Sequence, residues 1–234
     1  MSRFAYTLDA DDPAAPPLGL IVLRADETIE PEFRRYLAGH AGPLYVTRVA
    51  SAPEVTRESL TEMKAVLTAA ADLLPKGIHY PVVGYGCTSA SAVIGCEGIE
   101  KMVQLGCDAG TVTNPLRAAC AQAEHLGVSR FALLSPYIEE VSEPLRAAFA
   151  ERGISTDVFG SFGEAEEAKV VRIARKSIIE AAVELGRDPG TEAVFLSCTN
   201  LRTIDAIPEI AERLGKPVLS SNSSLHWHMQ QLAV

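Results

Sequence analysis

The sequence predicts an α/β fold of two pseudo-symmetric lobes, each a parallel sheet flanked by helices, with the active site in the cleft between them. Apolar runs of strand length alternate with longer segments of helical period along the whole chain, which is typical of βα units. A buried strand ending in Cys-Thr also occurs twice, at Cys87 and at Cys198. The chain therefore consists of two copies of one plan, which would pack as two lobes.

Eight short apolar runs are predicted to be strands because each has strand length and the helical segments separate them. In chain order they are 18–23, 44–49, 81–85, 109–112, 130–134, 155–159, 193–196 and 218–220. The first run has its counterpart in the fifth, as the third has in the seventh, and this pairing defines the repeat.

Helices are predicted between the strands, and several are expected to stop at a glycine acting as a left-handed C-cap. These glycines are Gly127, Gly153 and Gly215. The clearest helices are 59–74, 115–126, 139–152, 164–185 and 204–214.

The domain boundaries follow from the repeat, because no Pro/Gly/Ser-rich linker separates the halves. Residues 1–17, rich in Asp and Pro, are expected to form a polar N-terminal arm. Residues 18–113 are expected to form the first lobe together with 216–234, the last strand returning to it. The second lobe is then 114–215.

Composition excludes several classes of protein. With 47% hydrophobic residues among 234, the chain can bury a sizeable core, and its formal net charge of −9 argues against a nucleic-acid partner. There is neither a signal-peptide pattern nor an apolar run long enough to cross a membrane, so a cytoplasmic protein is expected. The five cysteines show no CxxC pair, so we expect reduced thiols and no zinc site.

Cys87 and Cys198 are expected at the carboxyl ends of parallel strands, where such sheets bind ligands. Each is expected to open a helix, whose free N–H groups and dipole would lower the thiol pKa from about 8.5 toward neutrality. The polar residues that follow can cap these helices, while their N–H groups can hold a substrate carboxylate. These residues are Thr88, Ser89, Thr199 and Asn200.

A pair of thiols suits proton transfer at carbon. Removing a proton beside a carboxylate and returning one to the opposite face needs a base on one side and an acid on the other. Two related lobes would supply both reagents without a cofactor. The alternative is that a cysteine is an ordinary core residue, and we keep that interpretation for Cys96, Cys107 and Cys120.

Three segments carry a family resemblance: Gly-Cys-Thr-Ser at 86–89, Ser-Cys-Thr-Asn-Leu-Arg-Thr at 197–203, and Pro-Val-Leu-Ser-Ser-Asn-Ser-Ser-Leu-His-Trp at 217–227. They resemble the aspartate/glutamate racemase superfamily, and within it the branch of maleate cis-trans isomerase and arylmalonate decarboxylase. The resemblance implies the two-lobed fold, a small carboxylate substrate, and neither metal nor pyridoxal phosphate. It is also compatible with a homodimer.

The resemblance assigns roles to particular residues. Cys87 and Cys198 match the two cysteines that both racemases and maleate isomerases use. Decarboxylases of this branch keep only the second, so Cys87 favours an isomerase or racemase. Tyr137 resembles a tyrosine that binds a substrate carboxylate, with ordinary packing as the alternative. Asn222 would line the cleft floor or merely cap the last helix.

One departure concerns the substrate. Asp26 stands where maleate isomerases present an asparagine to a substrate carboxylate, and an ionised aspartate would repel that carboxylate. Residues 162–170 contain glutamates rather than a second expected asparagine. Both changes favour an amino-acid-like substrate, as does the likeness of the Asp26 loop to racemase-like proteins of ectoine-utilisation clusters. The alternative for Asp26 is a helix N-cap ahead of Ile29.

Other functions stay open at this point. A maleate isomerase would use the same cysteine pair, and a decarboxylase would need Cys198 alone. A non-catalytic two-lobed protein could close over a ligand instead. A metal site at His226 and His228 is rejected, because residues two apart on a helix point in different directions.

Overall fold

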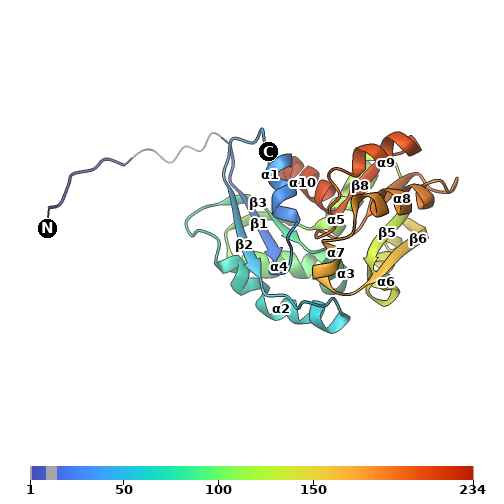
Figure 1. Ribbon diagram of the computed structural model, residues 1–234. Coiled ribbons are helices and arrows are strands. Elements are labelled where there is room, and N and C mark those ends of the chain that lie inside the picture. Colours follow the sequence, from blue (N-terminus) through green and yellow to red (C-terminus); the bar gives the residue numbers. More distant parts are fainter. Residues whose placement is uncertain (1, 9–14, 234) are drawn as a thin grey trace.

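The computed structural model describes residues 2–8 and 15–233 and contains two parallel sheets of four strands each (Figure 1). In spatial order, the first sheet consists of β2 (Leu44–Val49), β1 (Leu18–Leu23), β3 (Tyr80–Gly86) and β4 (Ala109–Thr113). The second consists of β6 (Ser155–Glu164), β5 (Arg130–Tyr137), β7 (Ala193–Leu196) and β8 (Val218–Ser220). The strand order repeats between the sheets, which confirms the predicted α/β class and the internal repeat.

The described helices flank both sheets. They are α1 (Ile29–Tyr36), α2 (Arg57–Asp72), α3 (Thr88–Ile94), α4 (Cys96–Gly106), α5 (Pro115–Leu126), α6 (Glu139–Ala150), α7 (Glu167–Val170), α8 (Arg175–Gly186), α9 (Ile207–Leu214) and α10 (Ser221–Leu232). Within the described ranges, no helix combines the length and apolar character needed to cross a membrane.

The helix predicted over 164–185 is wrong in its first part and confirmed from Arg175 onward by α8. Strand β6 continues to Glu164, with Gly163 at a φ of 67°, and Glu166 then forms an isolated bridge with Glu54 of the first lobe. The extended backbone at this crossing leaves only the short α7 before α8 begins at Arg175. This irregular segment brings α7 to the junction of the lobes.

The last strand does not return to the first lobe as predicted, because β8 pairs with β7 in the second sheet. Only the helix after it crosses over: Leu225 of α10 packs in one cluster with Leu20 of β1. The counterpart helix α5 crosses the other way, and its Leu116 packs with Phe131 and Phe195 of the second sheet. The apolar faces of these two helices therefore each cover the opposite lobe's sheet, which ties the lobes together.

The predicted N-terminal arm is described only in part, since residues 1 and 9–14 lie outside the described residues. Residues 2–8 are exposed, including Phe4 with 85% of its surface accessible. The arm as a unit stays a prediction.

Two glycines of α4, Gly98 and Gly106, differ in how much space surrounds them, and this difference shows where the helix approaches α2 most closely. A Cβ added to Gly106 would lie 2.4 Å from the carbonyl oxygen of Thr68 and 2.9 Å from the backbone nitrogen of Asp72. A Cβ added to Gly98 would have its nearest contact at 3.5 Å, from the Ile94 side chain. Of these two glycines, only Gly106 lies where the backbone of α4 packs directly against the backbone of α2.

We expect Gly106→Ala to lower the free energy of unfolding by about 1–3 kcal/mol, because backbone atoms cannot move aside for the added methyl group. Gly98→Ala is the matched control in the same helix. It is expected to raise that free energy by about 0.5–1 kcal/mol, since alanine has the better helix propensity. Urea unfolding measures both, and equal effects would contradict the close approach at Gly106.

Candidate active site

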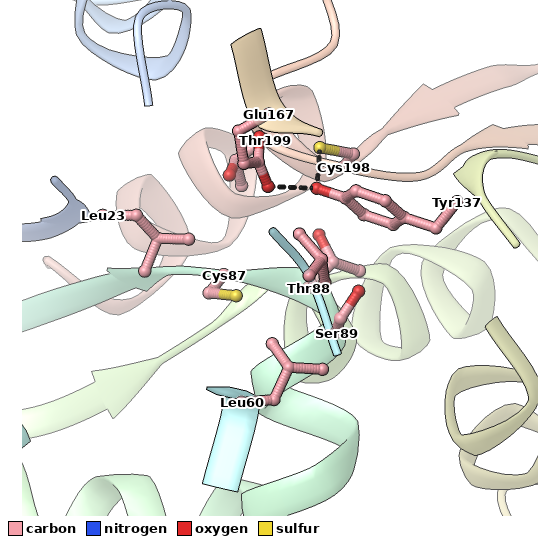
Figure 2. Close-up of a pocket in the computed structure, with 10 residues that line it drawn as sticks. Leu23, Leu60, Cys87, Thr88, Ser89, Tyr137, Glu167, Cys198 and Thr199 are labelled. Atoms are coloured by element: carbon pink, nitrogen blue, oxygen red, sulfur yellow. Dashed lines mark hydrogen bonds between the residues drawn. The ribbon is translucent and has the colours of Figure 1, made fainter. Parts of the chain in front are cut away.

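A small pocket lies between the lobes, beyond the carboxyl ends of the strands (Figure 2). Its empty volume is about 260 Å³, including the part open to solvent. Both lobes line it. The lining residues are Leu23, Val55, Leu60, Cys87, Thr88, Ser89, Tyr137, Glu167, Cys198 and Thr199.

Cys87 follows β3 and is the N-cap of α3, as predicted. Its Sγ accepts a hydrogen bond of 3.4 Å from the N–H of Ala90, and only 5% of the residue is exposed. Thr88 and Ser89 form the first turn of α3, where backbone N–H groups have no acceptor within the helix. These N–H groups and the Ser89 hydroxyl provide donors for an anion at this wall of the pocket.

Cys198 does not open a helix, which corrects the prediction. It lies in a turn after β7, and its φ of 92° is the only positive value at a non-glycine residue in the described chain. The Asn200 N–H donates to Sγ at 3.3 Å, while the Cys198 N–H donates to the Ser221 hydroxyl at 3.0 Å. Strained backbone of this kind persists where surrounding contacts hold it, often at functional sites.

Ser221 links the two cysteine motifs. Besides accepting from the Cys198 N–H, its hydroxyl accepts a hydrogen bond of 2.7 Å from the hydroxyl of Thr88. Thr88 adjoins Cys87, so one buried serine at the start of α10 fixes the two motifs relative to each other.

Tyr137 and Glu167 complete the wall beside Cys198. The Tyr137 hydroxyl lies 2.6 Å from Glu167 Oε1 and 2.9 Å from Cys198 Sγ (Figure 2). Asn200 Nδ2 donates to the other carboxyl oxygen of Glu167 at 2.7 Å. The predicted residues Tyr137 and Cys198 are thus in contact, and Glu167 joins them.

Asp26 is buried but does not line the pocket. The N-cap of α1 is Thr28, not Asp26 as the alternative predicts. Asp26 Oδ1 nevertheless accepts hydrogen bonds of 2.8 Å from the N–H groups of Thr28 and Ile29 at the start of this helix. Its Oδ2 is buried without a hydrogen-bond partner among the described residues. The hydrogen bonds at the start of α1 therefore explain the position of Oδ1, while Oδ2 can still accept a hydrogen bond.

Asn200 and Asn222 lie behind the pocket wall rather than in its lining. Asn200 holds Glu167, as described above. Asn222 Nδ2 donates to Glu32 Oε2 and to the carbonyl oxygen of Thr199, both at 2.8 Å. Of the predicted site residues, the structure brings six into one lining: Cys87, Thr88, Ser89, Tyr137, Cys198 and Thr199.

The histidines of α10 lie apart from this pocket. His228 Nδ1 is 2.8 Å from the Thr113 hydroxyl, and His226 stacks on Tyr36. In residues 2–8 and 15–233, no three His, Cys, Asp or Glu side chains are grouped so as to hold a metal ion.

Comparison with known proteins identifies the family. Residues 18–234 match the family described as arylmalonate decarboxylase. The chain belongs to this family. The arylmalonate decarboxylase of Bordetella bronchiseptica is 36% identical over 123 residues, which are 52% of this chain and 48% of that protein. The match thus spans about half of the relative's length.

Solved structures of the arylmalonate decarboxylase family and of maleate isomerases share the fold. A liganded arylmalonate decarboxylase variant has a TM-score of 0.77 at 27% identity, covering 94% of this chain and 93% of its own. A Nocardia farcinica maleate cis-trans isomerase variant with a covalently bound succinylcysteine intermediate has a TM-score of 0.82 at 21% identity, with the same coverage. The two-lobed fold predicted from the sequence is confirmed.

Burial changes the expected electrostatics of both thiols. It raises the pKa of Cys87 to about 12 and that of Cys198 well above its ordinary value, and the nearby carboxylates Glu167 and Asp26 raise both further. The prediction of thiol pKa values near neutrality is therefore wrong. Desolvation outweighs the few N–H groups that would stabilise a thiolate.

Glu167 is the site residue that sequence reasoning missed. The glutamates of residues 162–170 favour an amino-acid-like substrate, but the sequence pattern assigns none of them to the site. The sequence feature that could have identified Glu167 is an acidic side chain soon after β6, the strand that corresponds to β2 of the first lobe. Its place in the pocket depends on the irregular crossing between β6 and α7, which no periodic pattern predicts.

Proposed function

We propose that this protein is a cofactor-independent isomerase, of the racemase type, that acts on a small amino-acid-like carboxylic acid. The observation that carries the proposal is that Cys87 and Cys198 line one pocket from opposite lobes. A proton is removed from the carbon beside the carboxylate by one sulfur, and the other sulfur delivers a proton to the opposite face.

The start of α3 is proposed to bind the substrate carboxylate. Thr88 and Ser89 present first-turn N–H groups at the pocket wall, and Ser89 adds its hydroxyl. The hydroxyls of Thr88 and Thr199 donate within the protein, to Ser221 and to the Gly86 carbonyl oxygen. The first-turn N–H groups and the Ser89 hydroxyl also stabilise the negative charge that develops on the carboxylate when the neighbouring carbon loses its proton.

The charge of the site favours a substrate with an ammonium group. Glu167 lines the pocket and Asp26 is buried close behind it, whereas none of the described lining residues is Lys, Arg or His. A dicarboxylate such as maleate would meet repulsion from these acids, while an ammonium group would offset their charge. Such a cation would also lower the pKa of both thiols from their raised values, since those carboxylates help to raise them.

Decarboxylation is the second candidate, because the family match and the Bordetella relative both carry that name. That reaction needs one thiol to protonate the carbon left by carbon dioxide. It gives Cys87 no role, although Cys87 lines the same pocket as Cys198.

Deuterium exchange separates these functions. In D₂O we expect deuterium at the α-carbon of a small amino acid from a panel of both enantiomers, with loss of optical activity and no release of carbon dioxide. Proton NMR and polarimetry measure this. Carbon dioxide from an arylmalonate, or fumarate from maleate, without α-exchange of any amino acid would overturn the proposed reaction. Binding of amino acids without any turnover would indicate a non-catalytic binding protein.

A further inference from the structure

The hydrogen bonds of Tyr137 raise a question of proton count. Its hydroxyl contacts both Glu167 Oε1, at 2.6 Å, and Cys198 Sγ, at 2.9 Å, yet a hydroxyl has a single proton. One partner must therefore donate to Tyr137. Either the Cys198 thiol donates to Tyr137 and Tyr137 donates to the Glu167 carboxylate, or a protonated Glu167 donates to Tyr137 and Tyr137 donates to the Cys198 thiolate.

We propose that Glu167 is the proton acceptor for Cys198 and that Tyr137 relays the proton between them. The S–H bond of Cys198 breaks as Tyr137 Oη takes that proton, and the original Tyr137 proton passes to Glu167 Oε1. The products are a thiolate, an unchanged tyrosine and a neutral carboxyl group, so atoms and charge balance. The role of Cys198 as a base rests on the proposed function, but the relay itself does not require a substrate.

Asn200 fixes the geometry of both ends of this relay. Its Oδ1 accepts the Glu27 N–H at 2.9 Å, which directs Nδ2 toward Glu167 Oε2 and leaves Oε1 for Tyr137. Its own backbone N–H donates to Cys198 Sγ at 3.3 Å and would stabilise the thiolate. A single residue therefore orients the proton acceptor and favours the charged form of the donor.

Burial makes Glu167 a better base than an exposed glutamate. It raises the pKa of this carboxyl group, and the negative charge of Asp26, from the segment between β1 and α1, raises it further. Cys87, the N-cap of α3 across the pocket, accepts a hydrogen bond from the Ala90 N–H. The Tyr85 hydroxyl beside it donates to the Met63 sulfur at 3.8 Å, so among the described residues no carboxyl group is linked to this thiol through a tyrosine. The relay thus serves Cys198 and makes the two thiols chemically unequal.

The alternative is that Glu167 stays ionised and merely positions Tyr137. The two interpretations predict opposite signs for Glu167→Gln. A permanent negative charge raises the pKa of the Cys198 thiol, so its removal would increase the thiolate fraction. Loss of a proton acceptor would decrease that fraction.

Alkylation of Cys198 by iodoacetamide at pH 7, followed by mass spectrometry of its peptide, measures the thiolate without substrate. We expect Glu167→Gln to slow this alkylation by about tenfold or more, as a rise of one unit in the apparent pKa would do. An equal or faster rate would overturn the relay. Glu166→Gln is the matched control, because Glu166 is half-exposed and pairs with Lys169, and its rate should not change.

Two further measurements guard against a loss of folding and against confusion with the proposed reaction. The rate at partly exposed Cys107 reports unfolding in the same sample. In a Tyr137→Phe background the relay is already cut, so adding Glu167→Gln should cause no further slowing; a second tenfold loss there would contradict the relay. Slower alkylation in Glu167→Gln with no α-exchange of any amino acid would keep the relay and reject the racemase proposal.

Discussion

Replacing either Cys87 or Cys198 by serine is expected to reduce racemisation by about 10²–10⁴-fold, the range that a positioned general acid or base contributes. A serine hydroxyl has nearly the same shape but is a far weaker acid, so each variant lacks one of the two reagents. Both residues are almost fully buried in one lining, so the substitution should leave the pocket intact. Polarimetry with the substrate found by deuterium exchange gives the rates.

Cys107→Ser and Cys120→Ser are the controls for these variants. Both cysteines lie outside the pocket lining and are partly exposed, so full activity is expected. A Cys87→Ser variant with undiminished activity would indicate chemistry through Cys198 alone and favour the decarboxylase. Undiminished racemisation in both pocket variants would exclude the two-thiol mechanism.

The inner strands β1, β5 and β7 were predictable because they are short apolar runs, as burial of both faces requires. The bounds of β1, β2, β7 and β8 agree with the predicted ones residue for residue. The Cys-Thr repeat also located five lining residues correctly, since strand ends in a parallel sheet converge on one edge, and the family resemblance added Tyr137. Local pattern and chain topology were sufficient there.

Long-range contacts account for what the sequence did not predict. The backbone at Cys198 has a positive φ because Ser221 and Asn200 hold the turn from outside the strand. β8 pairs within the second sheet, whereas α10 covers the first sheet. A single boundary at 215/216 assigns both elements to the first lobe and is therefore wrong for β8. Glu167 enters the pocket only because β6 and α7 cross toward Glu54.

Glu32 of α1 joins the lobes, and its removal is expected to be the most destabilising change considered. Its Oε1 accepts the N–H groups of Thr203 at 2.8 Å and Ile204 at 2.9 Å, and its Oε2 accepts from Asn222 at 2.8 Å. Glu32→Ala would leave these buried donors without acceptors, at a cost of about 3 kcal/mol. For a chain of this size the melting temperature should fall by roughly 6–12 °C, measurable by calorimetry.

Glu30→Ala is the control in the same helix, because Glu30 forms only partly exposed ion pairs with Arg34 and Arg48. Glu30→Ala should change the free energy of unfolding by no more than about 1 kcal/mol. A loss as large as that of Glu32→Ala would show that Glu32 does not hold the lobes together.

The pH dependence of stability gives a second test of Glu32. Burial raises the pKa of Glu32 above its ordinary 4.5, so the unfolded chain ionises first and this group's contribution to stability falls as pH rises past that value. Glu32→Gln, which cannot titrate, should therefore lose more stability at pH 4 than at pH 7.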